Sequence, residues 1–183
     1  MLVKMGQCSL ETRQGDIANQ PNMVAIVNAA NAELRMGGGV AGAIHKAAGP
    51  ELEKECQSLA PITPGEAVIT GAYRLPNQYI IHCLGPIYGL DKPEDTLLSS
   101  CYRNALNLAD RKQIHSIAFP AISTGAFGYP IKLATQVALN TVNQVLPTLR
   151  HVKCIRFVLF SEAELDIYNS KLTAIFDSKD TND

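Results

Sequence analysis

The feature that most constrains this chain is a strand-to-helix unit whose two elements are joined by a glycine-rich loop. The apolar run Val24-Ala-Ile-Val27 predicts a buried strand, and apolar residues from about Ala41 to Gln57 follow a helical spacing. The connection from Asn28 to Gly42 contains two asparagines and four glycines. Glycine loses more backbone entropy on folding than other residues, so this run indicates close approach of a ligand to bare backbone, or unusual dihedral angles.

The rest of the chain alternates in the same way between short β-rich runs and longer helical patterns. The spacing predicts further strands at 2–10, 67–72, 79–84, 116–119 and 154–160, and helices at 94–111, 132–146 and 162–176. This alternation predicts a single α/β domain over residues 1–176, with helices on both faces of a mixed, mostly parallel sheet. The polar tail at 177–183 is expected to fray.

Composition narrows the class of protein. The 183 residues fit one domain, and 16 basic against 17 acidic side chains give a formal charge of −1, which argues against nonspecific nucleic-acid binding. The five cysteines are scattered without a CxxC pair, which favours reduced thiols over disulfides or zinc ligands. No signal peptide and no membrane-length apolar run is visible, so we expect a cytoplasmic protein, monomeric and without a membrane partner.

Four loops are expected at the carboxyl edge of the sheet, where folds of this kind bind ligands. They are residues 15–16, 28–42, 123–128 and 161–162. The 28–42 and 123–128 loops are both rich in glycine and could hold a phosphate or diphosphate between backbone N–H groups and helix N-termini. Neither loop contains a lysine, and Arg35 is the only nearby cation. Neutral backbone recognition of a diphosphate is therefore expected.

Three familiar enzyme signatures fit poorly. The stretch Gly37-Gly-Gly39-Val-Ala-Gly42 satisfies GxGxxG, but it lies some distance after its strand, and no strand-terminal acid follows about 20 residues later. The phosphate-binding sequence GxxxxGK[ST] is absent, and Ser123-Thr-Gly lacks the leading glycine of GxSxG. The four histidines stand apart from other ligand types, so no metal site is expected.

Several motifs in sequence order resemble those of the macrodomain family of ADP-ribose-binding modules, with the MacroD-type branch as the best match. The matching stretches cover nearly the whole chain: Gly15-Asp16-Ile17, 25–31, 37–40, 44–50, 71–76, 79–82, Gly85-Pro86, 118–130 and 166–168. The resemblance implies a three-layer α/β/α sandwich that binds ADP-ribose without a cofactor. It also implies hydrolysis of mono-ADP-ribose from acidic side chains of proteins and deacetylation of O-acetyl-ADP-ribose.

The resemblance also implies residue roles in binding. Asp16 would accept a hydrogen bond from the adenine amino group, although an aspartate there could simply cap a turn. Phe160 would pack on adenine or belong to the core. The 123–128 loop would hold the diphosphate, with Phe127 against the distal ribose. The expected ligand-binding residues are Asp16, Ile17, Asn31, Gly37, Gly38, Gly39, Val40, Ala41, Ile122, Ser123, Thr124, Gly125, Ala126, Phe127, Gly128 and Phe160.

Asn31, Asn28 and His45 match the family's candidate catalytic positions. The amide of Asn31 can both donate and accept, so it could fix the ribose hydroxyls. Asn28 could instead hold its loop by bonding backbone, and His45 could be a packed helix residue. MacroD-type proteins generally carry an aspartate where this chain has Ala41, a departure that puts a protein-supplied general base in doubt.

Three hypotheses follow from these residues. The first is a hydrolase in which a water, held between the α-phosphate and the anomeric carbon of the distal ribose, attacks with help from the substrate itself. The second is a reader that binds ADP-ribosylated proteins without cleaving them. The third is a structural or RNA-binding domain without ADP-ribose affinity, whose RNA-binding version the near-neutral charge disfavours.

Overall fold

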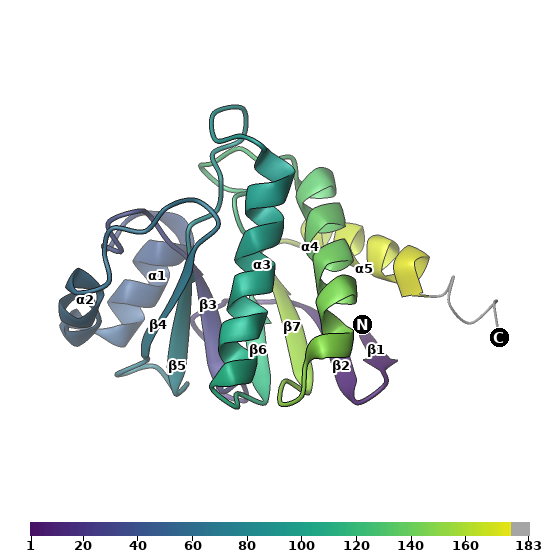
Figure 1. Ribbon diagram of the computed structural model, residues 1–183, viewed down its shortest axis with the longest axis horizontal. Coiled ribbons are helices and arrows are strands. Elements are labelled where there is room, and N and C mark those ends of the chain that lie inside the picture. The colour runs from purple at the N-terminus through teal and green to yellow at the C-terminus, as the bar shows by residue number, and fades with distance from the viewer. Residues whose placement is uncertain (177–183) are drawn as a thin grey trace.

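Seven strands form one mixed sheet in the order β1-β2-β7-β6-β3-β5-β4 (Figure 1). The computed structural model describes residues 1–176, so the polar tail predicted at 177–183 lies outside the described residues. The central strands run parallel, while β1 pairs antiparallel with β2 and β4 pairs antiparallel with β5. The strands are β1 Leu2–Met5, β2 Cys8–Gln14, β3 Ala25–Ala29, β4 Ala67–Gly71, β5 Tyr79–Cys83, β6 Ser116–Phe119 and β7 Cys154–Leu159.

Helices cover both faces of the sheet and complete the expected three-layer α/β/α sandwich (Figure 1). One hydrophobic core joins the sheet to α3, α4 and α5, and a second joins its other face to α1 and α2. Successive side chains of a strand point to opposite faces of the sheet and so pack into different cores. In β3, Val27 belongs to the first core and Ile26 to the second. The helices are α1 Gly39–Ala48, α2 Pro50–Gln57, α3 Glu94–Arg111, α4 Ile131–Val145 and α5 Glu162–Phe176, with a 3-10 turn at Leu146–Thr148.

Two of the expected elements were wrong in extent. The helix expected from Ala41 to Gln57 is two helices, because Gly49 adopts a φ of 89° and Pro50 opens α2. The strand expected at 2–10 is a hairpin of β1 and β2, since Gly6 turns the chain with a φ of 59°. The other strands and helices agree with expectation to within two residues at each end.

The four loops expected at one edge of the sheet do meet there. Strands β2, β3, β6 and β7 are mutually parallel through the sheet order, so the segments after their carboxyl ends share an edge. These segments begin at Gly15, Ala30, Pro120 and Phe160. In the described part of the chain, no helix is long and apolar enough to cross a membrane.

Candidate functional site

A cleft with two chambers occupies this edge. The larger chamber has a volume of about 880 Å³ and the smaller one about 280 Å³. Gly39, Val40, Ala121 and Gly125 line both chambers. The cleft therefore runs continuously over the start of α1 and the loop after β6.

Asp16 and Phe160 stand on the walls of the larger chamber. Asp16 Oδ1 accepts the Ala18 N–H at 2.8 Å, which stabilises the turn after β2 and leaves the second carboxylate oxygen available to a ligand. The Phe160 side chain is 89% exposed, so the alternative that it is a core residue is wrong. An aromatic ring held beside a cleft in this way offers a flat stacking surface.

A buried arginine supports the turn that carries Asp16. Arg156 of β7 is only 7% exposed and bonds the Glu11 carboxylate at 2.7 Å and the Gln20 side-chain oxygen at 3.0 Å. Gln20 Nε2 in turn donates to the Asp16 carbonyl at 2.8 Å. Sequence reasoning missed this support, although a charged residue inside the apolar run 154–160 was its visible signal.

Unpaired backbone amides line the middle of the cleft. Among the described residues, none accepts a hydrogen bond from the amides of Gly125, Ala126 and Phe127. The first amides of α1 also lack a partner in the described part of the chain. The first bond there runs from the Gly42 N–H to the Gly38 carbonyl at 3.2 Å, and Gly38 supplies no side-chain cap. Free N–H groups at a helix N-terminus, as in α1, and in a neighbouring glycine loop can bind anions without any charged side chain.

Asn31 lies in the smaller chamber and is held in one orientation by its own loop. Its Oδ1 accepts the Arg35 N–H at 3.0 Å, and its Nδ2 donates to the Arg35 carbonyl at 2.8 Å. These two bonds use about half of the hydrogen-bonding capacity of the Asn31 side-chain amide. One N–H and one oxygen lone pair therefore remain for a ligand. A pre-oriented amide of this kind can fix a pair of hydroxyl groups.

Close backbone contacts shape the smaller chamber. A Cβ on Gly42 would collide with the Gly37 carbonyl oxygen, and a Cβ on Gly85 would collide with the Ser123 hydroxyl. Ser123 itself adopts a φ of 67°, a left-handed conformation that costs free energy in a non-glycine residue. Its buried hydroxyl has no partner among the described residues and lies in the chamber wall, so it is available to a ligand or a water.

Asn28 and His45 lie beneath the cleft rather than in its lining. Asn28 is fully buried, and its Nδ2 lies 3.0 Å from His82 Nδ1, while His82 Nε2 lies 2.9 Å from Thr70 Oγ1. Burial lowers the pKa of His82 to about 3, and it also lowers the pKa of His45. A lowered pKa favours the neutral imidazole of both histidines at neutral pH. Asn28 does not bond the backbone of its loop as the alternative expected, because its Nδ2 pairs with the His82 side chain and its Oδ1 has no partner among the described residues.

Most of the expected ligand-binding residues come together in the cleft. Of the residues named from the sequence, Asn28, His45 and Gly128 are outside its lining. Gly128 closes the loop instead, with a φ of 71° and an N–H that donates to the Gly125 carbonyl at 3.0 Å. Lining residues that were not among the expected ligand-binding residues are Gln14, Gly15, Ala29, Ala30, Gly85, Pro120, Ala121, Val158 and Glu164.

Among residues 1–176, no carboxylate lines the smaller chamber. Ala41 occupies the first turn of α1, and Glu33 is exposed and outside the lining. The carboxylates of the cleft, those of Asp16 and Glu164, belong to the larger chamber, and Glu164 already accepts the Phe160 N–H at 3.0 Å. Within residues 1–176, no group of three or more His, Cys, Asp or Glu side chains could hold a metal ion.

The fold and cleft place this chain in a known family. A family model described as Macro domain matches residues 27–138. A Macro domain-containing protein of Chlorobaculum tepidum is 48% identical over 151 residues, which cover 82% of this chain and 88% of that protein. One from Methanosarcina mazei is 53% identical over 134 residues, covering 73% and 71%. The chain belongs to the Macro domain family.

Solved structures agree with this assignment. The Oceanobacillus iheyensis macrodomain with ADP superposes with a TM-score of 0.93 at 43% identity and covers 97% of each chain. The Trypanosoma brucei macrodomain in complex with ADP-ribose superposes with a TM-score of 0.83 at 35% identity, covering 89% of this chain and 68% of the other.

Proposed function

We propose that this protein binds ADP-ribose and hydrolyses mono-ADP-ribose esters of acidic protein side chains, with O-acetyl-ADP-ribose as a second ester substrate. These are activities of the MacroD-type branch, to which we assign the chain. The macrodomains that superpose on it were solved with ADP and with ADP-ribose, which supports binding of the same ligand here.

The two chambers fit the two ends of ADP-ribose. The larger chamber takes the adenosine, with Phe160 against the base and the free Asp16 oxygen accepting the adenine amino group. The unpaired amides between the chambers take the diphosphate. The distal ribose then lies in the smaller chamber, where Asn31 orients its hydroxyls and Phe127 covers it.

The chemistry proposed for the smaller chamber needs no protein base. In the protein esters, a water attacks the anomeric carbon of the distal ribose, and the bond from that carbon to the ester oxygen breaks. The carboxylate leaves with the bonding electrons, and the water proton passes to an α-phosphate oxygen and then to solvent. A carboxylate is a good leaving group, so positioning by Asn31 and the glycine loop can supply several kcal/mol of the barrier.

The observation that supports this proposal most is the composition of the smaller chamber, which the described residues line with a pre-oriented amide and free backbone N–H groups but with no carboxylate. Ala41 also leaves the first turn of α1 without an acidic side chain, so nothing there opposes the diphosphate. These features favour substrate-assisted attack over general-base catalysis.

A timed hydrolysis assay on a glutamate-linked mono-ADP-ribosylated protein tests the enzyme function. We expect release of ADP-ribose well above the rate in buffer. The same features also support a second function, a reader that binds ADP-ribosylated partners without cleaving them. A chamber without a carboxylate can bind the distal ribose even if it does not catalyse hydrolysis. Turnover no faster than buffer, with ADP-ribose binding intact, would leave the reader and exclude the hydrolase.

The setting proposed for this activity is a monomer in the cytoplasm. The five cysteines are free thiols, four of them buried, which supports a reducing compartment. Burial raises the pKa of Cys8 and Cys56 to about 11, so these thiols stay protonated and unreactive at neutral pH.

A further inference from the structure

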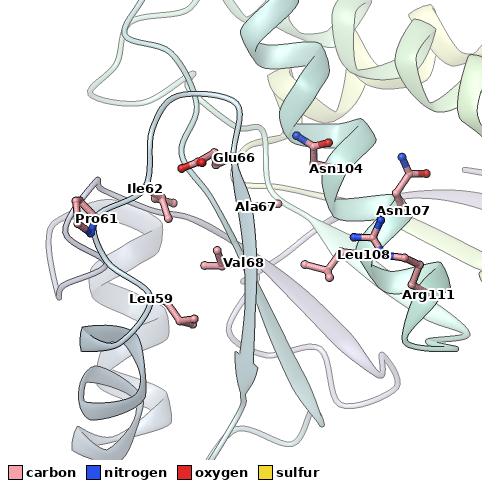
Figure 2. A pocket seen from close by; sticks show the side chains of 10 residues that line it. All are labelled: Leu59, Pro61, Ile62, Glu66, Ala67, Val68, Asn104, Asn107, Leu108 and Arg111. Carbon is pink, nitrogen blue, oxygen red and sulfur yellow. The ribbon is translucent and has the colours of Figure 1, made fainter.

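The sheet ends in an open strand edge at β4, and a groove of about 350 Å³ runs along it. Figure 2 shows β4 between a loop on one side and helix α3 on the other. The residues that line the groove are Leu59, Pro61, Ile62 and Glu66 from the loop before β4, Ala67 and Val68 from the strand, and Asn104, Asn107, Leu108 and Arg111 from α3. No part of the binding cleft is included in this lining.

The edge of β4 presents unpaired backbone groups to the groove. The Ala72 N–H bonds the Gln78 carbonyl and the Leu84 N–H bonds the Glu66 carbonyl, so even-numbered residues of β4 face β5. Ala67 and Ile69 therefore turn their N–H and C=O groups outward, and no described residue pairs with them. At the far end, the Gly71 N–H is taken by the Glu55 carboxylate at 3.1 Å, so the open edge spans residues 67–69.

One end of this groove adjoins the smaller chamber of the cleft. The Ile62 N–H donates to the Ala32 carbonyl at 2.9 Å, and Ala32 directly follows Asn31. On the strand side, Glu66 pairs with Leu84, whose neighbour Gly85 lines the smaller chamber. The lining of the smaller chamber is thus joined through Ala32 and Leu84 to both sides of the groove at the start of β4.

The α3 side of the groove carries the positive charge of Arg111, while the loop before β4 carries the Glu66 carboxylate at the other end of the lining. Arg111 is exposed, and no ion pair joins it to another described residue. Asn107 likewise has no hydrogen-bond partner for its side chain among the described residues, whereas Asn104 is anchored to the Gly65 carbonyl at 2.8 Å. An extended segment along β4 would pass beneath both free side chains, and a carboxylate on it would complement Arg111.

We propose that this groove binds the polypeptide that flanks the ADP-ribosylated side chain, as an extended strand added to β4 with an acidic residue near Arg111. The inference rests on the proposed function, because it needs the ADP-ribose moiety in the cleft. Strand addition suits such a partner because its hydrogen bonds join main-chain N–H and C=O groups. It therefore tolerates many peptide sequences. The groove thus adds affinity for modified polypeptide over free ADP-ribose.

The test compares two ligands by titration calorimetry. One is free ADP-ribose, and the other is an acidic peptide of about ten residues that carries ADP-ribose through a hydrolysis-resistant linkage, long enough to span the open edge. Ala67→Pro removes an outward N–H without touching the β4–β5 pairing, and Ala67→Val is its control with the N–H retained. Arg111→Glu reverses the groove charge, and Lys112→Glu makes the same change on the next exposed residue, outside the groove.

We expect Ala67→Pro and Arg111→Glu each to weaken peptide binding by about fivefold and to leave free ADP-ribose binding within about twofold. Both control variants should bind the two ligands like the wild type. Equal affinity of the wild type for peptide and free ADP-ribose, or equal effects of groove and control variants, would overturn the inference. These experiments measure binding, so they test the groove whether or not the protein hydrolyses its ligand. Absence of hydrolysis would refute the enzyme function but not the binding role of the groove.

Discussion

Asp16→Asn separates the two jobs of the Asp16 carboxylate. One oxygen accepts the Ala18 N–H at 2.8 Å, and the other is free for the adenine amino group. The asparagine amide has one oxygen and one NH₂, so whichever way it turns, either the turn or the adenine loses its acceptor and faces a donor instead. A hydrogen bond to a charged acceptor contributes about 1.5–3 kcal/mol, so ADP-ribose affinity should fall by about tenfold to a hundredfold.

Titration calorimetry with ADP-ribose measures this loss, and Glu162→Gln is a matched control on an exposed carboxylate outside the cleft. The control should bind as the wild type does. Asp16 is exposed, so the Tm of Asp16→Asn should stay within a few degrees of wild type. Unchanged affinity in Asp16→Asn would refute the placement of adenine in the larger chamber.

Three further predictions concern stacking, packing and pH. Phe160→Ala should weaken ADP-ribose binding by about 1–3 kcal/mol, with little change in Tm because the ring is 89% exposed; an unchanged Kd contradicts the stacking role. Gly42→Ala should lower the free energy of unfolding by about 2 kcal/mol in urea titrations, because its Cβ would strike the Gly37 carbonyl. The pKa of His82 is about 3 in the folded protein, so the unfolded chain binds its proton first as the pH falls. Stability should therefore drop by about 2 kcal/mol from pH 7 to pH 5, and a flat profile would contradict the buried neutral imidazole.

The alternation of strands and helices was enough to predict the layers and the edge that carries the cleft. Two breaks in the predicted elements were not foreseen, because each depends on the backbone conformation of a single residue. Gly49 separates α1 from α2, and Gly6 separates β1 from β2. A glycine inside a periodic pattern does not reveal whether its φ will be positive until the tertiary structure is known.

The sequence predicted the site residues that lie in a recognisable motif. It did not predict those whose contacts join distant parts of the chain. The motifs gave Asn31 and the loop after β6, and both line the cleft. The pairing of Asn28 with His82 joins residues that are 54 positions apart, and the support of Asp16 by Arg156 passes through Gln20. No local pattern could connect these residues, since their meeting depends on the strand order of the folded sheet.

The most direct test of the central claim follows the oxygen of the attacking water. The glutamate-linked mono-ADP-ribosylated protein is hydrolysed in ¹⁸O-water, and the released glutamate side chain is analysed by mass spectrometry. Attack at the anomeric carbon leaves both carboxylate oxygens unlabelled, which is the result expected for a water held between Asn31, the α-phosphate and the distal ribose. One ¹⁸O in the glutamate carboxylate would mean attack at the ester carbonyl and would contradict this account.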